Sequence, residues 1–313
     1  MNTNIDNRLV IKAPAKINLH LEVLGKRNDG FHELAMVMQS INLVDVLEME
    51  ISNDSVMNLS INCNDLSNNE DNLIIKAAKY LIEYVNNQNL GANIYLKKNI
   101  PIGAGLAGGS SDAAATLIGL NKLWSLNLTS REIHKIAAKI GSDVPFCLDG
   151  GSQFCFGRGE ILEQFKQESS YGLLLIKNPS VSLSTAEIYS QYSNQYNHTF
   201  ISSEENFQKR RNQLLSKGFQ ESNIFINKIN IQNDLQNIAI RKCNSVRDGL
   251  TILKNLENVL AYSMSGSGPS CYAIFENIKT AKETYKKNKD TFLNYGFKVW
   301  ICDFLNHGVK FIN

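Results

Sequence analysis

Residues 101–115 read Pro101-Ile102-Gly103-Ala104-Gly105-Leu106-Ala107-Gly108-Gly109-Ser110-Ser111-Asp112-Ala113-Ala114-Ala115, which is a glycine-rich segment followed by an alanine run. Glycine lets the backbone turn several N–H groups toward one point, and a helix N-terminus adds partial positive charge there. Together these features bind phosphate. An ordinary tight turn with Ser110 or Ser111 as the helix N-cap would account for one or two of the glycines. Because it does not need all four, we predict a phosphate-binding loop that runs into a helix over 112–123.

Two other kinds of nucleotide-binding loop fit this segment less well. The spacing of Gly103, Gly105 and Gly108 matches a dinucleotide fingerprint, but such a match is weak on its own. No acidic residue ends a second parallel strand about 20 residues further on, as that fold requires. The P-loop pattern GxxxxGK[ST] does not occur in the sequence. An NAD-dependent enzyme is therefore kept only as an alternative, which binding of a nicotinamide cofactor that ATP does not displace would support.

A strand is predicted upstream of the loop, where apolar and polar residues alternate from Ile17 to Leu24. The alternation places Ile17, Leu19, Leu21 and Val23 on one face, and Lys16, Asn18, His20 and Glu22 on the other. Same-face neighbours lie about 6.5 Å apart along a strand, so we expect Lys16 and Asn18 to reach one ligand together.

The remaining pattern mixes helices and strands without a regular βαβ repeat, which predicts an α+β fold. Helices are expected over 72–85, 130–140, 245–258 and 279–294, and strands over 46–50, 92–96, 171–176, 271–275 and 297–303. A chain of 313 residues predicts two domains, and glycines near 150 and 157 favour a boundary near residue 165. We therefore expect domains at 1–165 and 166–313, with a polar surface insertion of uncertain order near 191–233.

Composition narrows the class of protein. The chain is 43% hydrophobic and contains no apolar stretch of about 20 residues, so we expect no membrane span. A net charge of +2 does not suggest a nucleic-acid partner. The six cysteines form no CxxC pair, which argues against structural zinc and disulfides. With no secretory signal recognised at the N-terminus, a cytoplasmic location is expected. The expected assembly is a monomer or weak homodimer.

Three ordered motifs identify a resemblance. The segments are Ala13-Pro14-Ala15-Lys16-Ile17-Asn18-Leu19, the glycine loop 101–111, and Ser263-Met264-Ser265-Gly266-Ser267-Gly268-Pro269-Ser270. They resemble the motifs of the GHMP kinases, a superfamily that includes galactokinase, homoserine kinase and mevalonate kinase. The resemblance implies an ATP-dependent small-molecule kinase with an N-terminal domain like domain 2 of ribosomal protein S5 and a ferredoxin-like C-terminal α/β sandwich. The active site would lie in the cleft between them, with residues 101–111 around the ATP phosphates.

The same resemblance implies a catalytic pair. Asp143 stands in Gly141-Ser142-Asp143-Val144-Pro145-Phe146, where it would take the proton of the acceptor hydroxyl. Lys16 would keep that aspartate ionised and neutralise charge on the transferred phosphate, and Asn18 would orient the substrate. The alternatives are that Asp143 merely caps the next helix and that Lys16 is a solvated strand residue.

Within the superfamily, two segments resemble the cytidyl-methylerythritol kinases: the one around Asp143 and Arg27-Asn28-Asp29-Gly30-Phe31-His32. In that family the aromatic-His pair reads cytosine, so Phe31 would stack on the base and His32 would bond its polar edge. Tyr189 would cover the other face, although a buried core tyrosine is a comparable interpretation. The implied substrate is a cytidine-diphosphate-linked methylerythritol of the non-mevalonate isoprenoid pathway.

Mg²⁺ is expected, because phosphoryl transfer from ATP normally uses a hard cation. Ser110 or Ser111 is the nearest hydroxyl in sequence, but no metal-binding residues are assigned. Ala107 replaces a glycine that relatives often have, a change expected to leave the loop intact. One rival hypothesis is a homoserine- or mevalonate-type kinase, which the segment Asp29-Gly30-Phe31-His32 argues against. The other is a non-catalytic nucleotide-binding module, which the presence of both Lys16 and Asp143 argues against. The turn at 265–268 would either close over the ligands or join the domains.

Overall fold

The computed structural model describes residues 8–165, 171–201, 203–218 and 231–312 and shows the mixed α+β fold that the sequence predicts. The first sheet has the strand order β12-β1-β2-β4-β3, with β5 and β8 pairing β2 and β1, and β6 pairing β5. Its strands are β1 (Leu9–Lys26), β2 (His32–Ile51), β3 (Met57–Ile61), β4 (Ala92–Lys97), β5 (Ser152–Gly157), β6 (Ile161–Phe165), β8 (Gln232–Asn233) and β12 (Lys310–Phe311). The predicted strand over 46–50 is the last part of the 20-residue β2.

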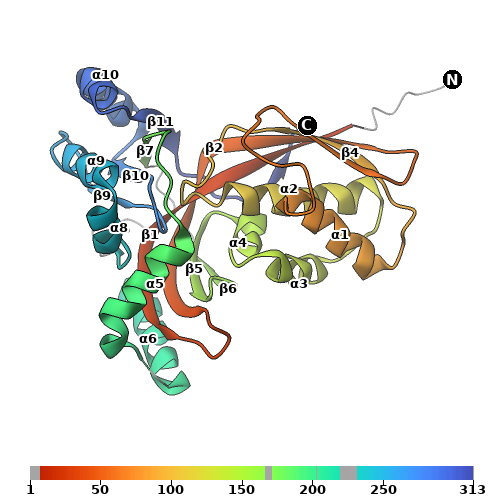
Figure 1. Cartoon of the computed structure of the whole chain (residues 1–313), viewed down its shortest axis with the longest axis horizontal. Coiled ribbons are helices and arrows are strands. Elements are labelled where there is room, and N and C mark those ends of the chain that lie inside the picture. Colours follow the sequence, from red (N-terminus) through yellow and green to blue (C-terminus); the bar gives the residue numbers. More distant parts are fainter. Residues whose placement is uncertain (1–7, 166–170, 202, 219–230, 313) are drawn as a thin grey trace.

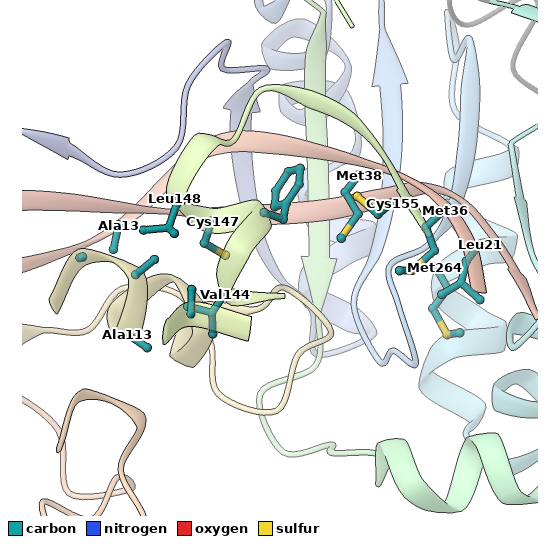
Figure 2. Close-up of a cluster of buried hydrophobic side chains, with 14 of the residues drawn as sticks. Ala13, Leu21, Met36, Met38, Ala113, Val144, Cys147, Leu148, Cys155 and Met264 are labelled. Atoms are coloured by element: carbon teal, nitrogen blue, oxygen red, sulfur yellow. The ribbon is translucent and has the colours of Figure 1, made fainter. Parts of the chain in front are cut away.

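Four helices lie along one side of this sheet (Figure 1). They are α1 (Leu73–Val85), α2 (Gly108–Leu123), α3 (Ser130–Ile140) and α4 (Val144–Asp149). Asn72 caps α1 and Thr129 closes a capping box on α3, so both predicted helices are confirmed. Figure 2 shows Ala113 of α2 and Cys147 of α4 packing in one apolar cluster with Ala13 of β1. These small side chains let α2 approach the sheet closely.

The second sheet is antiparallel, with the order β11-β7-β10-β9. It contains β7 (Gly172–Lys177), β9 (Ala261–Met264), β10 (Cys271–Phe275) and β11 (Lys298–Asp303). The helices α8 (Gln236–Lys242), α9 (Asn244–Lys254) and α10 (Ile278–Asn294) lie beside it (Figure 1). Leu174 and Ile176 share a core cluster with residues of α9 and α10, whereas Leu173 and Leu175 share one with Ile17 and Phe154 of the first sheet. The second sheet is therefore packed between helices and the first sheet.

A β-bulge corrects the predicted faces of β1. Asn18 pairs with Met38 but His20 pairs with Val37, so Leu19 is an extra residue in the strand. Since side chains alternate across a strand, the extra residue moves His20 and Glu22 to the face opposite Lys16 and Asn18. The prediction that all four share one polar face was wrong. Glu22 instead forms an ion pair with Arg210, at 2.8 Å.

The segment 191–233 is more ordered than the sequence suggested in the parts that the structure describes. Helix α5 (Thr185–Tyr196) extends into it and is followed by the short 3₁₀ turn η1 (Asn197–Thr199) and α6 (Glu204–Gly218). Figure 1 shows α5 and α6 beside the hairpin formed by β1 and β2. Residues 202 and 219–230 lie outside the described part of the chain.

The domain division at residue 165 remains a proposal. Two short strands from the second half of the chain, β8 and β12, both pair with β1 of the first sheet. The chain therefore crosses back twice to the first sheet after the proposed boundary.

All six cysteines are free thiols, and five of them are buried. Figure 2 shows two of them, Cys147 and Cys155, within an apolar cluster. In the part of the chain that the structure describes, no helix has the length and apolar character needed to span a membrane.

Candidate active site

A cavity of about 1150 Å³ collects nearly all of the predicted site residues. Its wall includes parts of β1, β2, the glycine loop, the start of α4, α5 and the glycine turn 265–268, together with residues between 66 and 73 that lead into α1. The predicted residues that line it are Lys16, Asn18, Phe31, His32, residues 101–110, Asp143 and Tyr189. Ser111 is the exception: it is fully buried in α2 and does not line the cavity.

Lys16, Asn18 and Asp143 form a polar group within this cavity. The Lys16 ammonium donates a hydrogen bond to Asn18 Oδ1 at 2.7 Å and lies 3.4 Å from Asp143 Oδ2. The Lys16 side chain is 6% exposed and that of Asp143 is 29% exposed, so the lysine lies behind the carboxylate. Asp143 does occupy the N-cap position of α4, but its side chain makes no capping hydrogen bond. Its carboxylate is therefore available to a ligand in the cavity.

The glycine loop is fixed between β1 and the C-terminal glycine turn. The Lys16 backbone N–H donates to the Leu106 carbonyl at 3.1 Å, which ties the loop to β1. On the other side, Ser265 Oγ donates to the Gly105 carbonyl at 2.9 Å. Gly105 has a φ of +72°, and a Cβ there would clash with the Ser265 carbonyl oxygen. The turn at 265–268 thus holds the loop by direct contact, and Gly266 and Ser267 also line the cavity.

Helix α2 begins at Gly108, four residues before the predicted start at Asp112. The N-cap is Ala107, in the left-handed conformation with φ of 53°, and it makes no side-chain capping bond. The suggestion that Ser110 or Ser111 caps the helix was therefore wrong. The prediction failed because Gly108 and Gly109 are poor helix formers, so propensity alone places them in the loop. The first-turn N–H groups of α2 consequently come from the loop residues that line the cavity.

An aromatic group surrounds His32 at another part of the cavity. The His32 and Tyr189 rings stack with centroids 5.1 Å apart, and His32 Nε2 lies 2.6 Å from Ser193 Oγ. Phe31 is 53% exposed, and the Arg158 guanidinium lies 4.9 Å from its ring centroid. Arg158 also lines the cavity and was not predicted. Tyr189 therefore reaches the site while also packing against the core, so its two predicted interpretations do not exclude each other.

A buried triad of ionisable side chains beneath the glycine loop was also not predicted. Lys98 Nζ lies 2.5 Å from Asp45 Oδ2 and 2.6 Å from Asp112 Oδ2. Asp45 Oδ1 accepts hydrogen bonds from the backbone N–H groups of Asn99 and Ile100, which lead into the loop. Burial raises the pKa of Asp112 to about 8, although Lys98 lowers it. A charged residue inside the apolar Val44-Asp45-Val46 run is the sequence signal for such a triad.

Asn233 and Asp234 connect three parts of the site. The Asn233 amide donates to the carbonyl oxygens of Met264 and Gly266, both at 2.8 Å, and so fixes the glycine turn. Asp234 Oδ2 accepts from the Val23 N–H at 2.8 Å and from the Tyr192 hydroxyl at 3.1 Å, joining β1 to α5. Sequence reasoning missed both residues, because they lie at the end of a polar segment with no apolar periodicity.

Comparison with known proteins agrees with this geometry. Family models for the GHMP kinases N terminal domain and the GHMP kinases C terminal match residues 72–151 and 203–293, together more than half of the chain. A 4-diphosphocytidyl-2-C-methyl-D-erythritol kinase from Prochlorococcus marinus subsp. pastoris is 52% identical over 305 residues, covering 97% of this chain and 98% of the relative. Another, from the strain NATL1A of Prochlorococcus marinus, is 50% identical over 306 residues, or 97% of this chain and 96% of the relative.

Solved structures share the fold. A crystal structure of 4-(cytidine 5'-diphospho)-2C-methyl-D-erythritol kinase superposes with a TM-score of 0.71 at 25% identity, covering 94% of this chain and 98% of that one. Homoserine kinase from Cytophaga hutchinsonii superposes with a TM-score of 0.74 at 16% identity, covering 100% of this chain and 99% of that one, which shows the fold alone. The chain therefore belongs to the GHMP kinases and, among them, to the family of the 4-diphosphocytidyl-2-C-methyl-D-erythritol kinases, and it is an ATP-dependent kinase.

Proposed function

We propose that this kinase transfers the γ-phosphoryl group of ATP to the 2-hydroxyl of 4-diphosphocytidyl-2-C-methyl-D-erythritol, giving ADP and the 2-phosphate in the non-mevalonate pathway. The observation that carries the proposal is the Lys16–Asp143 pair, with a 3.4 Å N–O distance, in a cavity shared with the N-terminus of α2 and the ring of His32. Full-length similarity to relatives with this name supports the choice of substrate.

Asp143 is proposed as the general base. Its carboxylate accepts the proton of the 2-hydroxyl as that oxygen forms a bond to the γ-phosphorus. The bond between the γ-phosphorus and the bridging oxygen then breaks, and ADP leaves with the electron pair. Lys16 supplies positive charge beside both the carboxylate and the transferred group, while Asn18 holds the Lys16 ammonium at 2.7 Å.

The ATP phosphates are proposed to bind along residues 101–111, with the N-terminal N–H groups of α2 directed toward them. Two hydrogen bonds, from the Lys16 N–H to the Leu106 carbonyl and from Ser265 Oγ to the Gly105 carbonyl, hold the loop backbone in place without ligand. A preformed cradle reduces the conformational entropy that ATP binding must overcome.

The cytosine ring is proposed to lie among Phe31, His32 and Tyr189, which the cavity brings together from β2, its preceding turn and α5. Phe31 is more than half exposed and carries Arg158 over its ring, so a base stacking on Phe31 meets a cationic neighbour. The ring of Tyr189 contacts His32, which places it next to the base edge that His32 would read.

The residues present fit a magnesium ion held mainly by ATP. Ser110 lines the cavity and is the hydroxyl that would contact the metal, whereas Ser111 is fully buried. The described part of the chain contains no cluster of three His, Cys, Asp or Glu side chains suited to a metal. Mg²⁺ would supply charge neutralisation of the phosphate oxygens, for which such a cluster is not required.

The rival substrate is a small alcohol without a nucleobase, as in homoserine or mevalonate kinases. Purified protein should be given Mg-ATP with each alcohol, and ADP release should be followed. We expect turnover with the cytidyl substrate and at least about 100-fold lower kcat/KM with homoserine and mevalonate, because these cannot use the contacts of Phe31 and His32. Comparable kcat/KM for the small alcohols would overturn the choice of substrate.

Location and assembly are proposed from the sequence alone. We propose a cytoplasmic monomer or weak homodimer without nucleic-acid partners; the six free thiols are consistent with a reducing compartment. Analytical ultracentrifugation at micromolar concentration tests the assembly state.

A further inference from the structure

The Ser193 hydroxyl makes two polar contacts but has only one proton to donate. Ser193 Oγ donates to the carbonyl oxygen of Tyr189, one turn earlier in α5, at 3.0 Å. It also lies 2.6 Å from His32 Nε2. A carbonyl oxygen can only accept, so the first bond uses the serine proton. The second contact is then a hydrogen bond only if His32 Nε2 carries the proton and donates it to the serine oxygen.

The protonation of Nε2 determines what the other ring nitrogen offers. Burial, with a smaller contribution from the charge of Lys26, lowers the pKa of His32, so the ring is neutral at pH 7. A neutral imidazole carries one proton, which leaves Nδ1 with a free lone pair. Among the described residues, no group forms a hydrogen bond with Nδ1. Because His32 lines the cavity, this acceptor is available to a bound ligand.

The ring is also held against rotation. Tyr189 stacks on it at 5.1 Å, and Phe200 contacts its edge with ring centroids 6.1 Å apart. Ser193 and Tyr189 belong to the same helix, whose position is fixed by the bond from Tyr192 to Asp234. When the orientation and tautomer of the His32 ring are fixed, Nδ1 can form a hydrogen bond with a donor of the ligand but not with an acceptor.

We propose that Ser193 is a positioning residue that fixes His32 as the Nε2–H tautomer, so that Nδ1 accepts from the exocyclic amino group of cytosine and rejects the oxygen that uracil has there. This inference rests on the proposed cytidyl substrate. Cytosine presents an amino donor at the position where uracil presents a carbonyl acceptor. With uracil, the lone pair of Nδ1 would face a carbonyl oxygen, so the hydrogen bond is lost and the two acceptors repel each other. This corresponds to a kcat/KM that is roughly tenfold or more lower for the uridyl compound.

The tautomer is measured directly by ¹⁵N NMR of the imidazole nitrogens, without substrate or turnover. The spectrum of a His32→Gln variant identifies the His32 signals among those of the five histidines. We expect protonated Nε2 and unprotonated Nδ1 in the wild type and in Ser193→Thr, and a mixture of tautomers in Ser193→Ala. A wild-type Nδ1–H tautomer, or a Ser193→Ala spectrum identical to that of the wild type, would overturn the proposal.

Base selection is measured with Mg-ATP and the cytidyl substrate or its uridyl counterpart. Ser193→Ala should lower the ratio of the two kcat/KM values by about tenfold, mainly through the KM for the nucleotidyl substrate. Ser193→Thr keeps the hydroxyl and should restore the ratio. An unchanged ratio in Ser193→Ala would contradict the role of Ser193, whereas a wild-type enzyme that phosphorylates neither compound would contradict the proposed function instead.

Discussion

Substitution of alanine for Gly105 tests whether the C-terminal glycine turn holds the phosphate loop in place. At Gly105, φ is +72°, and the new Cβ would clash with the Ser265 carbonyl oxygen and lie 3.1 Å from that of Gly268. Gly103 is a matched control, because its φ is +59° but a Cβ there would meet only Ser182 Cβ, at 3.9 Å. The two substitutions therefore share backbone strain and differ in the contact with the turn.

The expected losses in the free energy of unfolding follow from the backbone strain and from the steric contact with the turn. An alanine in the left-handed region costs about 1–2 kcal/mol, and the reduced freedom of the unfolded chain returns about 0.4–1 kcal/mol. Gly103→Ala should therefore destabilise the protein by about 1 kcal/mol. Gly105→Ala adds a steric term of about 1–3 kcal/mol, because two backbone segments must separate.

Thermal unfolding measures both variants against the wild type. At about 2–4 °C per kcal/mol, Gly103→Ala should lower Tm by roughly 2–4 °C and Gly105→Ala by roughly 4–16 °C. The KM for ATP should rise more in Gly105→Ala, since movement of the turn releases the loop. Equal Tm losses in the two variants would show that the contact between Gly105 and Ser265 does not hold the loop.

Three further outcomes are expected elsewhere in the site. Asp234→Ala should raise the KM for the cytidyl substrate by about tenfold, because α5 loses its attachment to β1, and Tyr192→Phe, which removes only one of these hydrogen bonds, should raise it less. An equal rise in the KM for ATP, measured by steady-state kinetics, would contradict this. Lys98→Met should destabilise the fold by about 3–5 kcal/mol in urea unfolding, because the buried Asp45 and Asp112 side chains both lose the cation that they contact. Adding Asp112→Asn should restore part of this. Burial and the charge of Lys26 lower the pKa of His32; as the pH falls through this pKa, Nδ1 gains a proton and the KM for the cytidyl substrate should rise. Lys26→Met should raise the pKa of His32 and so move the rise in KM to higher pH. A KM that does not change with pH would exclude His32 as the acceptor.

The sequence predicted the elements whose signals are local. Alternation and helical spacing located α1, α3, β4 and β10 to within a residue or two, and Asn72 and Thr129 act as caps. The glycine loop was recognised because clustered glycines before a helix have few other uses. Lys16 and Asp143 were found through motifs, and the structure brings them together across 127 positions of the chain.

What the sequence did not predict depends on contacts that form only on folding. The bulge at Leu19, which moved His20 to the other face of β1, is produced by pairing with β2 and leaves no mark in the alternating pattern. The start of α2 at Gly108 reflects tertiary packing that overrides weak helix propensity. Ser193 and Asn233 act through single hydrogen bonds to distant segments, which residue type alone does not reveal.

The most direct test of the account is the effect of Asp143→Asn on the reaction with Mg-ATP and 4-diphosphocytidyl-2-C-methyl-D-erythritol, followed by ADP release, with substrate binding measured by calorimetry. Asparagine keeps the shape of the side chain but cannot take the hydroxyl proton. We predict that kcat falls by about 10²–10⁴ while the affinity for both substrates changes little. Turnover close to that of the wild type would contradict the proposed role of Asp143 and the mechanism built on it.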